Sequence, residues 1–224
     1  MLFDLRSSGR RRTVKVVYLT LAFLMGGGLI FFGIGGSGLS GGLLDAFNGN
    51  SGGGSSVDAR FKKREQALVT RVRTNPKDAA AYADLARVRV QIAGQGDLYD
   101  PSSNQYTAEG RAELRRASAA WQKHLALAGG KPDPLVASVM VQAYASLNDV
   151  ANAVTAQEIV ADDRNSAGAY STLAQLAWQA GQTRKGDLAE QKAVALTPAD
   201  QRASVKGQLD SAKQQATTGA TGSG

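Results

Sequence analysis

The sequence predicts an all-α protein with one N-terminal transmembrane helix, a Gly-rich linker and a solenoid of about three helical hairpins with flanking helices. Three observations support this fold class. Residues 16–36 carry no charge, Gly and Ser dominate residues 37–56, and residues 57–216 are rich in Ala, Leu, Gln, Arg and Glu. In this last part apolar residues recur at helical spacing and no run alternates as strands do, so we expect helices throughout.

A basic tail, residues 1–15, precedes the uncharged segment, with Asp4 as its only acid and these cations: Arg6, Arg10, Arg11, Arg12 and Lys15. A helix over 16–34 would be about 28 Å long, close to the bilayer core of about 30 Å. Because positive residues stay on the cytoplasmic side, we expect a single-pass protein of the cell membrane, with a cytoplasmic N-terminus and an extracytoplasmic C-terminal domain. We expect the tail to contact membrane lipid.

A cleaved signal peptide is the alternative for the same segment. Its apolar region would exceed the usual length of about 7 to 15 residues, and no Ala-x-Ala site follows, so an uncleaved anchor is favoured. The linker composition is typical of a flexible coil, and residues 35–56 would reach about 26 Å. We expect this linker to hold the domain near the membrane without orienting it, and we expect residues 217–224 to be disordered.

Composition excludes several classes of function. The chain has no Cys and one His, which excludes disulfides, a thiol nucleophile and Cys- or His-cluster metal sites. No Gly-rich loop is followed by the Lys-Ser or Lys-Thr of a phosphate-binding helix, and Gly-x-Ser-x-Gly occurs only inside the linker, at 38–42 and 49–53, not between a strand and a helix. Cations and acids are mixed beyond residue 57, unlike the basic stripe of a nucleic-acid-binding protein. We therefore expect no enzymatic activity, no cofactor, no metal and no nucleic acid.

The helical part repeats. Turn-forming residues recur at 75–76, 94–103, 129–134, 147–149, 162–166, 181–182 and 197–198. Residues 75–88 are similar to residues 164–177, with three aligned pairs: Tyr82 with Tyr170, Leu85 with Leu173, and Ala86 with Ala174. Ala137 is the middle equivalent of the tyrosines, so the first step along the chain is long and the second is close to one repeat. A period of about 34 residues with an insertion of about 20 fits helix-turn-helix units.

In these features the chain resembles membrane-anchored bacterial proteins with tetratricopeptide repeats (TPRs). The expected repeats span about 76–131, 132–165 and 166–200, with an insertion at 94–110 and a capping helix at 200–216. The residues that match the TPR pattern are Tyr170, Leu173, Ala174, Ala177, Gly181, Ala189, Ala193 and Pro198 in the last unit, Met140, Val141, Tyr144, Ala153 and Val160 in the middle unit, and Tyr82, Leu85, Ala86, Ala117, Trp121 and Leu125 in the first. Arg89 and His124 depart from it.

The resemblance implies a concave partner-binding groove on the first helix of each pair. It would present Arg87, Gln91, Ser138, Gln142, Ser171, Gln175, Trp178 and Gln179. Only Arg87 could bind a carboxylate, so a neutral groove for an extended or helical peptide is expected. Two interpretations of Trp178 stay open, since its ring either anchors the peptide or packs against the C-terminal helix.

The insertion is the second candidate site, because long loops are uncommon unless they are functional or disordered. It carries Asp97, Tyr99, Asp100 and Tyr106. A partner-contacting loop and a solvated spacer are both open interpretations. Its acidic residues do not fall at the alternate spacing of an EF-hand loop.

These observations together predict a non-enzymatic, membrane-tethered interaction module, a scaffold or adaptor that binds a protein or peptide on the extracytoplasmic side. One alternative is a structural membrane protein that self-associates into a homo-oligomer. Another is an accessory subunit of an envelope-biogenesis enzyme complex.

Overall fold

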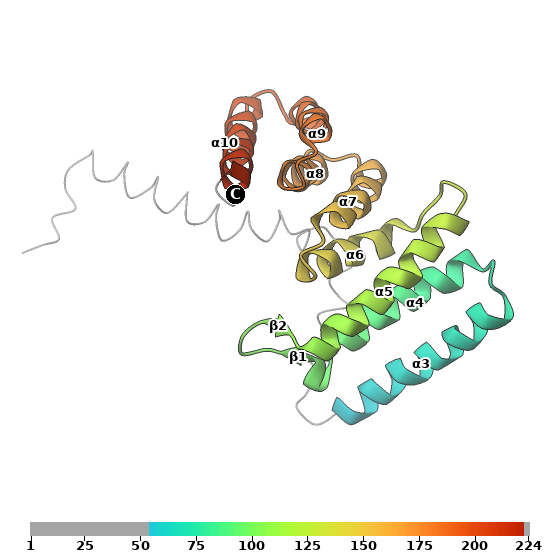
Figure 1. Ribbon diagram of the computed structural model, residues 1–224. Coiled ribbons are helices and arrows are strands. Elements are labelled where there is room, and N and C mark those ends of the chain that lie inside the picture. The colour runs from blue at the N-terminus through green and yellow to red at the C-terminus, as the bar shows by residue number, and fades with distance from the viewer. Residues whose placement is uncertain (1–53, 222–224) are drawn as a thin grey trace, which may run out of the picture. The chain divides into compact units, whose positions relative to one another are not determined.

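A computed structural model describes residues 54–221, and the all-α prediction is confirmed for this part of the chain (Figure 1). The α-helices are α3 (Gly54–Thr74), α4 (Ala79–Ala93), α5 (Ala108–Leu127), α6 (Pro134–Ser146), α7 (Val150–Arg164), α8 (Ala167–Gln179), α9 (Thr183–Leu196) and α10 (Arg202–Thr221). The predicted basic tail, transmembrane helix and linker residues 37–53 lie outside the described residues. Among the described helices, none is long and apolar enough to cross a bilayer.

The helices pack in consecutive pairs. Helix α4 packs on α5, α6 on α7, and α8 on α9, while contacts between α4 and α6 and between α7 and α8 join each pair to the next. Two further helices flank the pairs, because α3 packs on α4, and α10 packs on α8 and α9. Figure 1 shows the helices following one another in chain order.

The first helices of the three pairs begin at equivalent residues. The Asp78 carboxylate accepts from the Ala81 N–H at 2.9 Å, the Asp133 carboxylate from the Val136 N–H at 3.1 Å, and the Ser166 hydroxyl from the Ala169 N–H at 3.3 Å. Each cap satisfies a helix N–H that has no partner within the helix. The caps follow one another at the same two steps as the aligned tyrosine positions of the sequence.

The same positions of the three first helices are buried. Three, seven and eight residues after each cap lie side chains that are at most 8% exposed: Ala81, Leu85 and Ala86 in α4; Val136, Met140 and Val141 in α6; Ala169, Leu173 and Ala174 in α8. Spacing of four residues places the first two of each set on one helix face. The three pairs therefore share one register.

The second and third pairs also turn alike. Asn148 and Gly181 occupy equivalent positions and both have positive φ, 57° and 71°. The N–H of Asp149 binds the carbonyl of Tyr144 at 2.9 Å, and the N–H of Gln182 binds that of Ala177 at 2.8 Å. Both bonds close the six-to-one turn that follows a helix whose C′ residue is left-handed.

The first pair differs by more than the predicted insertion at 94–110. Its connection between the two helices is long, but α4 also has 15 residues against 13 in α6, and α5 has 20 against 15 in α7. The connection itself contains the 3₁₀ helix η1 (Gly96–Leu98) and a hairpin of β1 (Tyr99–Asp100) with β2 (Gln105–Tyr106). This short antiparallel pair is the exception to the expectation of no strands.

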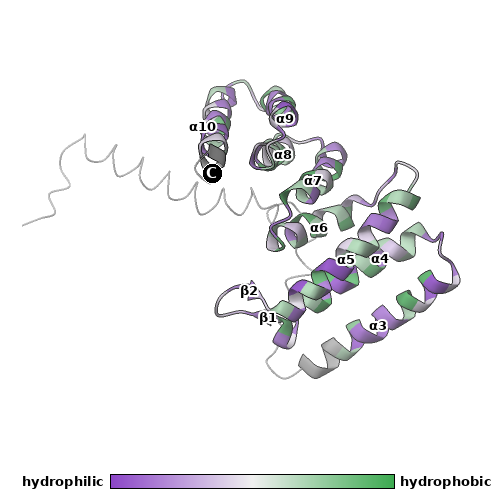
Figure 2. Ribbon diagram, viewed as in Figure 1, coloured by the Kyte–Doolittle hydropathy of each residue, from purple (hydrophilic) through white to green (hydrophobic). Residues whose placement is uncertain are grey.

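Apolar side chains of all three pairs form the core, and the flanking helices contribute a narrow stripe each. Trp121 and Tyr144 are the largest fully buried side chains, while α3 buries Leu68 and α10 buries Leu209. Figure 2 shows hydrophilic residues over much of α3 and α10. Both flanking helices are longer than expected, since α3 starts at Gly54 and α10 continues to Thr221. The Thr217 hydroxyl donates to the Lys213 carbonyl at 3.0 Å within the last helix.

Candidate functional site

The structure places the predicted groove residues on equivalent turns of α4, α6 and α8. Arg87, Gln142 and Gln175 share one register position and are exposed or half-buried, as are Gln91, Ser138 and Gln179. Arg87 pairs with Asp84, and the Ser138 hydroxyl donates to the Leu135 carbonyl at 2.7 Å. Ser171 and Trp178 are each only 3% exposed. The two cavities described below are lined by other residues.

Trp178 packs against the C-terminal helix, which decides between its two interpretations. Its indole N–H donates to the Asp187 carboxylate at 2.9 Å. Lys213 of α10 reaches the same carboxylate at 2.7 Å and lies 5.8 Å from the indole centroid. The Lys213 ammonium and the indole N–H lower the pKa of Asp187. Trp178 therefore joins α8, α9 and α10 and does not present its ring to a ligand.

The insertion is an ordered element that packs on the start of α5. Both the backbone N–H and the hydroxyl of Thr107 bond to the Leu98 carbonyl, at 3.0 and 3.2 Å. A side chain at Gly110 would overlap that same carbonyl oxygen, so only glycine allows this approach. The rings of Tyr99 and Tyr106 meet edge to face with centroids 5.2 Å apart. Burial and Tyr99 raise the pKa of Tyr106.

The acidic residues of the insertion have different surroundings. Asp100 accepts hydrogen bonds from the Ser102 hydroxyl at 2.6 Å and the Ser103 hydroxyl at 2.7 Å, which lower its pKa to about 2. Asp97 is exposed and lines a cavity. Among the described residues no group of three or more His, Asp or Glu could hold a metal ion.

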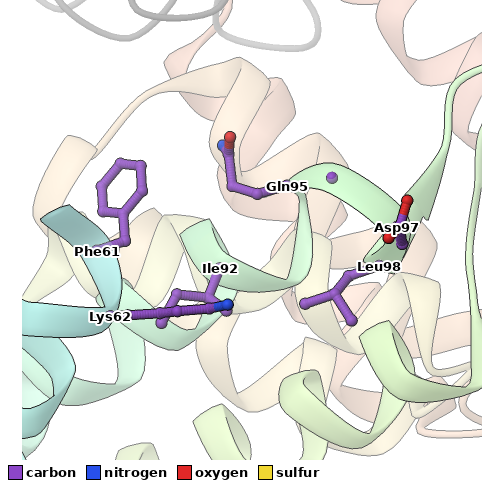
Figure 3. A pocket seen from close by; sticks show the side chains of 7 residues that line it. Phe61, Lys62, Ile92, Gln95, Asp97 and Leu98 are labelled. Atoms are coloured by element: carbon purple, nitrogen blue, oxygen red, sulfur yellow. The ribbon is translucent and has the colours of Figure 1, made fainter. Parts of the chain in front are cut away.

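That cavity lies between α3 and the end of α4 (Figure 3) and has a volume of about 250 Å³. Phe61, Ile92 and Leu98 supply apolar walls, and Lys62 extends along it from α3. Ligand pockets are usually about 300 to 1,000 Å³. This cavity is therefore small for a segment of a partner protein.

A larger cleft, about 570 Å³, lies between α7 and α9 above α8. Leu173 and Tyr170 of α8 line it from below, and the Tyr170 hydroxyl donates to the Asp162 carboxylate at 3.1 Å. Burial and Asp162 raise the pKa of Tyr170. Across the cleft Lys185 of α9 pairs with Glu158 of α7 at 2.7 Å. Both acidic residues of the cleft thus have partners inside it.

The α9 wall of the cleft carries an apolar side chain between two cations. Leu188 is 58% exposed, the most exposed large apolar side chain of the described residues. Arg184 precedes it by one turn and Lys192 follows it by one turn; neither forms an ion pair with a described carboxylate. The Lys192 ammonium lies 5.3 Å from the Tyr170 ring centroid. This face was not among the predicted site residues, although its signal, a basic-apolar-basic series at spacing four, is present in the sequence.

Arg89 and His124, the two residues that depart from the TPR pattern, stabilise the first pair. The Arg89 guanidinium lies 3.0 Å from Glu65 of α3 and 3.6 Å from the buried Glu113 of α5. His124 is buried, and its Nε2 accepts the Asp133 N–H at 2.9 Å. Its Nδ1 therefore carries the proton and donates to the Ala79 carbonyl at 2.9 Å. Both residues thus have structural partners.

No protein-family model matches the chain, and no curated protein sequence matches it. The repeat is therefore supported from within the chain, by its equivalent caps and its equivalent buried positions.

Proposed function

We propose that the chain is a membrane-tethered interaction module whose TPR-like helical pairs bind a segment of a partner protein on the extracytoplasmic side. The observation that supports it most is the shared register of the three first helices, with caps at Asp78, Asp133 and Ser166. Helical pairs in register stack into a continuous surface that is suited to binding extended or helical segments.

The cleft between α7 and α9 is the binding site in this proposal. A partner segment gains most from an apolar anchor that is removed from water at the centre of a contact. Leu188 offers such an anchor, with Leu173 and Tyr170 on the cleft floor. The predicted groove of α4, α6 and α8 offers no comparable apolar group, because Trp178 is buried.

The charges of the cleft define the chemistry of the segment. Glu158 is neutralised by Lys185, and Asp162 binds Tyr170, while Arg184 and Lys192 remain available at the two ends. These two residues are eight positions apart on α9, a rise of about 12 Å. The complementary ligand is an acidic segment with an apolar residue between two carboxylates about two helical turns apart.

Site-specific photo-crosslinking in the native membranes tests this function. A benzoylphenylalanine replaces Leu188 in the full-length chain, and a second version carries it at Leu135, which is also exposed but lies on the first turn of α6. We expect a discrete protein adduct from position 188 and none from 135. Adducts of equal yield from both positions, or a dimer of the chain itself at position 188, would contradict a partner-binding cleft.

A further inference from the structure

Helix α3 carries a cluster of cations that the interaction site does not use. Between residues 60 and 73 it has one carboxylate, Glu65, and six cations: Arg60, Lys62, Lys63, Arg64, Arg71 and Arg73. All six are exposed. Four of them fall within the range 60–64, so cations three and four positions apart, such as Arg60 with Lys63, repel each other along the helix.

The packing of α3 explains its apolar residues but not these cations. Phe61, Leu68 and Val72 face the core at helical spacing, and Glu65 between them pairs with Arg89 of α4. Arg71 pairs with Asp78 at 2.7 Å, and Arg64 lies 3.7 Å from Asp84. Helix α3 is thus held to the first pair by one face, and two of its six cations already have a partner.

The other four cations of α3 have no ion-pair partner among the described residues. Among the described residues no carboxylate pairs with Arg60, Lys62, Lys63 or Arg73; these four side chains are called the α3 cluster below. A local arrangement that costs the helix stability and has no internal compensation indicates an external partner. Four exposed cations without carboxylate partners along one helix fit an anionic surface.

Charge is also distributed unevenly along the described domain. Residues 57–131 carry 14 Lys and Arg against 8 Asp and Glu, a net charge of +6, while residues 132–224 carry 7 against 9, a net charge of −2. An anionic surface therefore attracts the half that contains α3 and repels the half that contains the cleft.

We propose that the α3 cluster binds the anionic lipid headgroups of the bilayer to which the chain is tethered. The inference uses the membrane tether of the proposed function, but not its peptide site. By sequence, only residues 37–53 separate the predicted transmembrane helix from Gly54, and this linker lies outside the described residues. A short linker gives an effective concentration of the order of millimolar. Weak electrostatic attraction at each cation then suffices for binding.

Binding of α3 to lipid would orient the helical domain on the membrane. With α3 on the bilayer, the acidic half of the domain and its cleft between α7 and α9 face away from the lipid. A partner segment that is itself acidic then meets Arg184 and Lys192 without competition from the membrane charge.

The test uses the full-length chain reconstituted in lipid vesicles. The chain lacks Cys, so Ala67→Cys places one fluorophore on the exposed side of α3, one turn after Lys63, and Ser211→Cys places one on α10. Vesicles of phosphatidylcholine alone are compared with vesicles in which about a third of the lipid is phosphatidylglycerol, each with spin-labelled headgroups as quenchers. Flotation with the vesicles verifies the tether separately.

We expect the label at 67 to be quenched at least threefold more in the anionic vesicles. The label at 211 should be unaffected, and the difference at 67 should vanish in about 1 M salt, where the screening length falls to about 3 Å. A variant with Gln at all four positions of the α3 cluster should lose the quenching. The matched control has Gln at four exposed cations of the same half, at Arg111, Arg115, Lys123 and Lys131, and should keep it.

Three results would overturn the inference. One is flotation of the chain with no quenching at 67 in the anionic vesicles. Another is an equal loss of quenching in the control variant, which would make net charge responsible. The third is displacement of the label from anionic vesicles by short duplex DNA at equal phosphate concentration, which would assign the cluster to nucleic acid. A chain that fails to float would instead contradict the membrane tether of the proposed function.

Discussion

The first and the last helical pairs reach the same register with different interior chemistry. The α4–α5 pair buries Glu113 and His124, holds the half-buried Arg89 beside Glu113, and carries the ordered insertion. The α8–α9 pair has a short turn and packs Trp178 over Gly186. The shared caps and the buried Leu and Ala positions therefore define the repeat, while the second helix of each pair varies. The insertion precedes the second helix of the first pair, and the cleft lies between the second helices of the other two pairs.

The two glycines that permit close packing offer the sharpest comparison of the two pairs. In the first pair Gly110 faces the Leu98 carbonyl, a backbone group held by Thr107. We expect Gly110→Ala to destabilise the domain by about 3 kcal/mol, because the insertion must detach from α5. Urea unfolding of the full-length protein in detergent measures this value, and Gly207→Ala, in open space on α10, is the control. A Gly110→Ala domain no less stable than the Gly207→Ala control would show that the insertion is not fixed on α5.

The buried charges of the first pair come next in expected effect. Arg89→Met removes the cation between Glu65 and Glu113 and leaves the buried Glu113 carboxylate with only the exposed Arg116 at 2.7 Å. We expect a loss of about 2 kcal/mol in unfolding free energy, since removal of one partner leaves a buried charge uncompensated. Adding Glu113→Gln should restore part of it. A double variant less stable than Arg89→Met alone would show that the charge of Glu113 is not the cause of the loss.

The matching change in the last pair should cost less. A side chain at Gly186 would overlap the indole of Trp178, a side chain that can move, whereas Gly110 faces backbone. We expect Gly186→Ala to cost about 1.5 kcal/mol and to shift the fluorescence of Trp178 to longer wavelength, measured in a Trp121→Phe background. Unchanged emission would mean that the ring has a free space to occupy and that α10 does not confine it.

Acid should affect the last pair through Asp187. The pKa of this carboxyl is lowered from its ordinary value of 3.8. The stabilisation that the Asp187 carboxylate contributes is therefore present above about pH 3.8, and it is lost as the pH falls through the lower pKa of the folded state. We expect Asp187→Asn to cost about 0.5 kcal/mol at pH 7 and to reduce the dependence of unfolding on pH below 4. If the unfolding free energy of the variant depends on pH as strongly as that of the natural chain, another group is responsible for the dependence.

Much of the fold could be predicted from the sequence because caps, turns and apolar spacing are local signals. Asp78, Asp133 and Ser166 each precede a helix by one residue, and Asn148 and Gly181 each end one. The extent of the insertion could not be predicted, because helix length within a pair depends on the packing of the partner helix. The strand pair β1–β2 spans only two residues on each side, too few for an alternating pattern.

The site was less accessible to the same reasoning. Whether Trp178 faced a groove or α10 depended on Asp187 and Lys213, which lie on the next helix and on the last one. The cleft depends on the distance between α7 and α9, which the sequence does not contain. Its α9 face does have a sequence signal, because Arg184, Leu188 and Lys192 follow one another at a spacing of four residues.

The most direct test of the proposed cleft is the yield of the crosslinked adduct at position 188 after charge reversal. One variant carries Arg184→Glu and Lys192→Glu, and its control carries Arg111→Glu and Lys123→Glu, which change the net charge equally outside the cleft. We predict that the adduct falls at least tenfold in the first variant and stays within twofold of the natural chain in the control. Equal yields in the two variants would contradict the cleft as the site where the acidic partner segment binds.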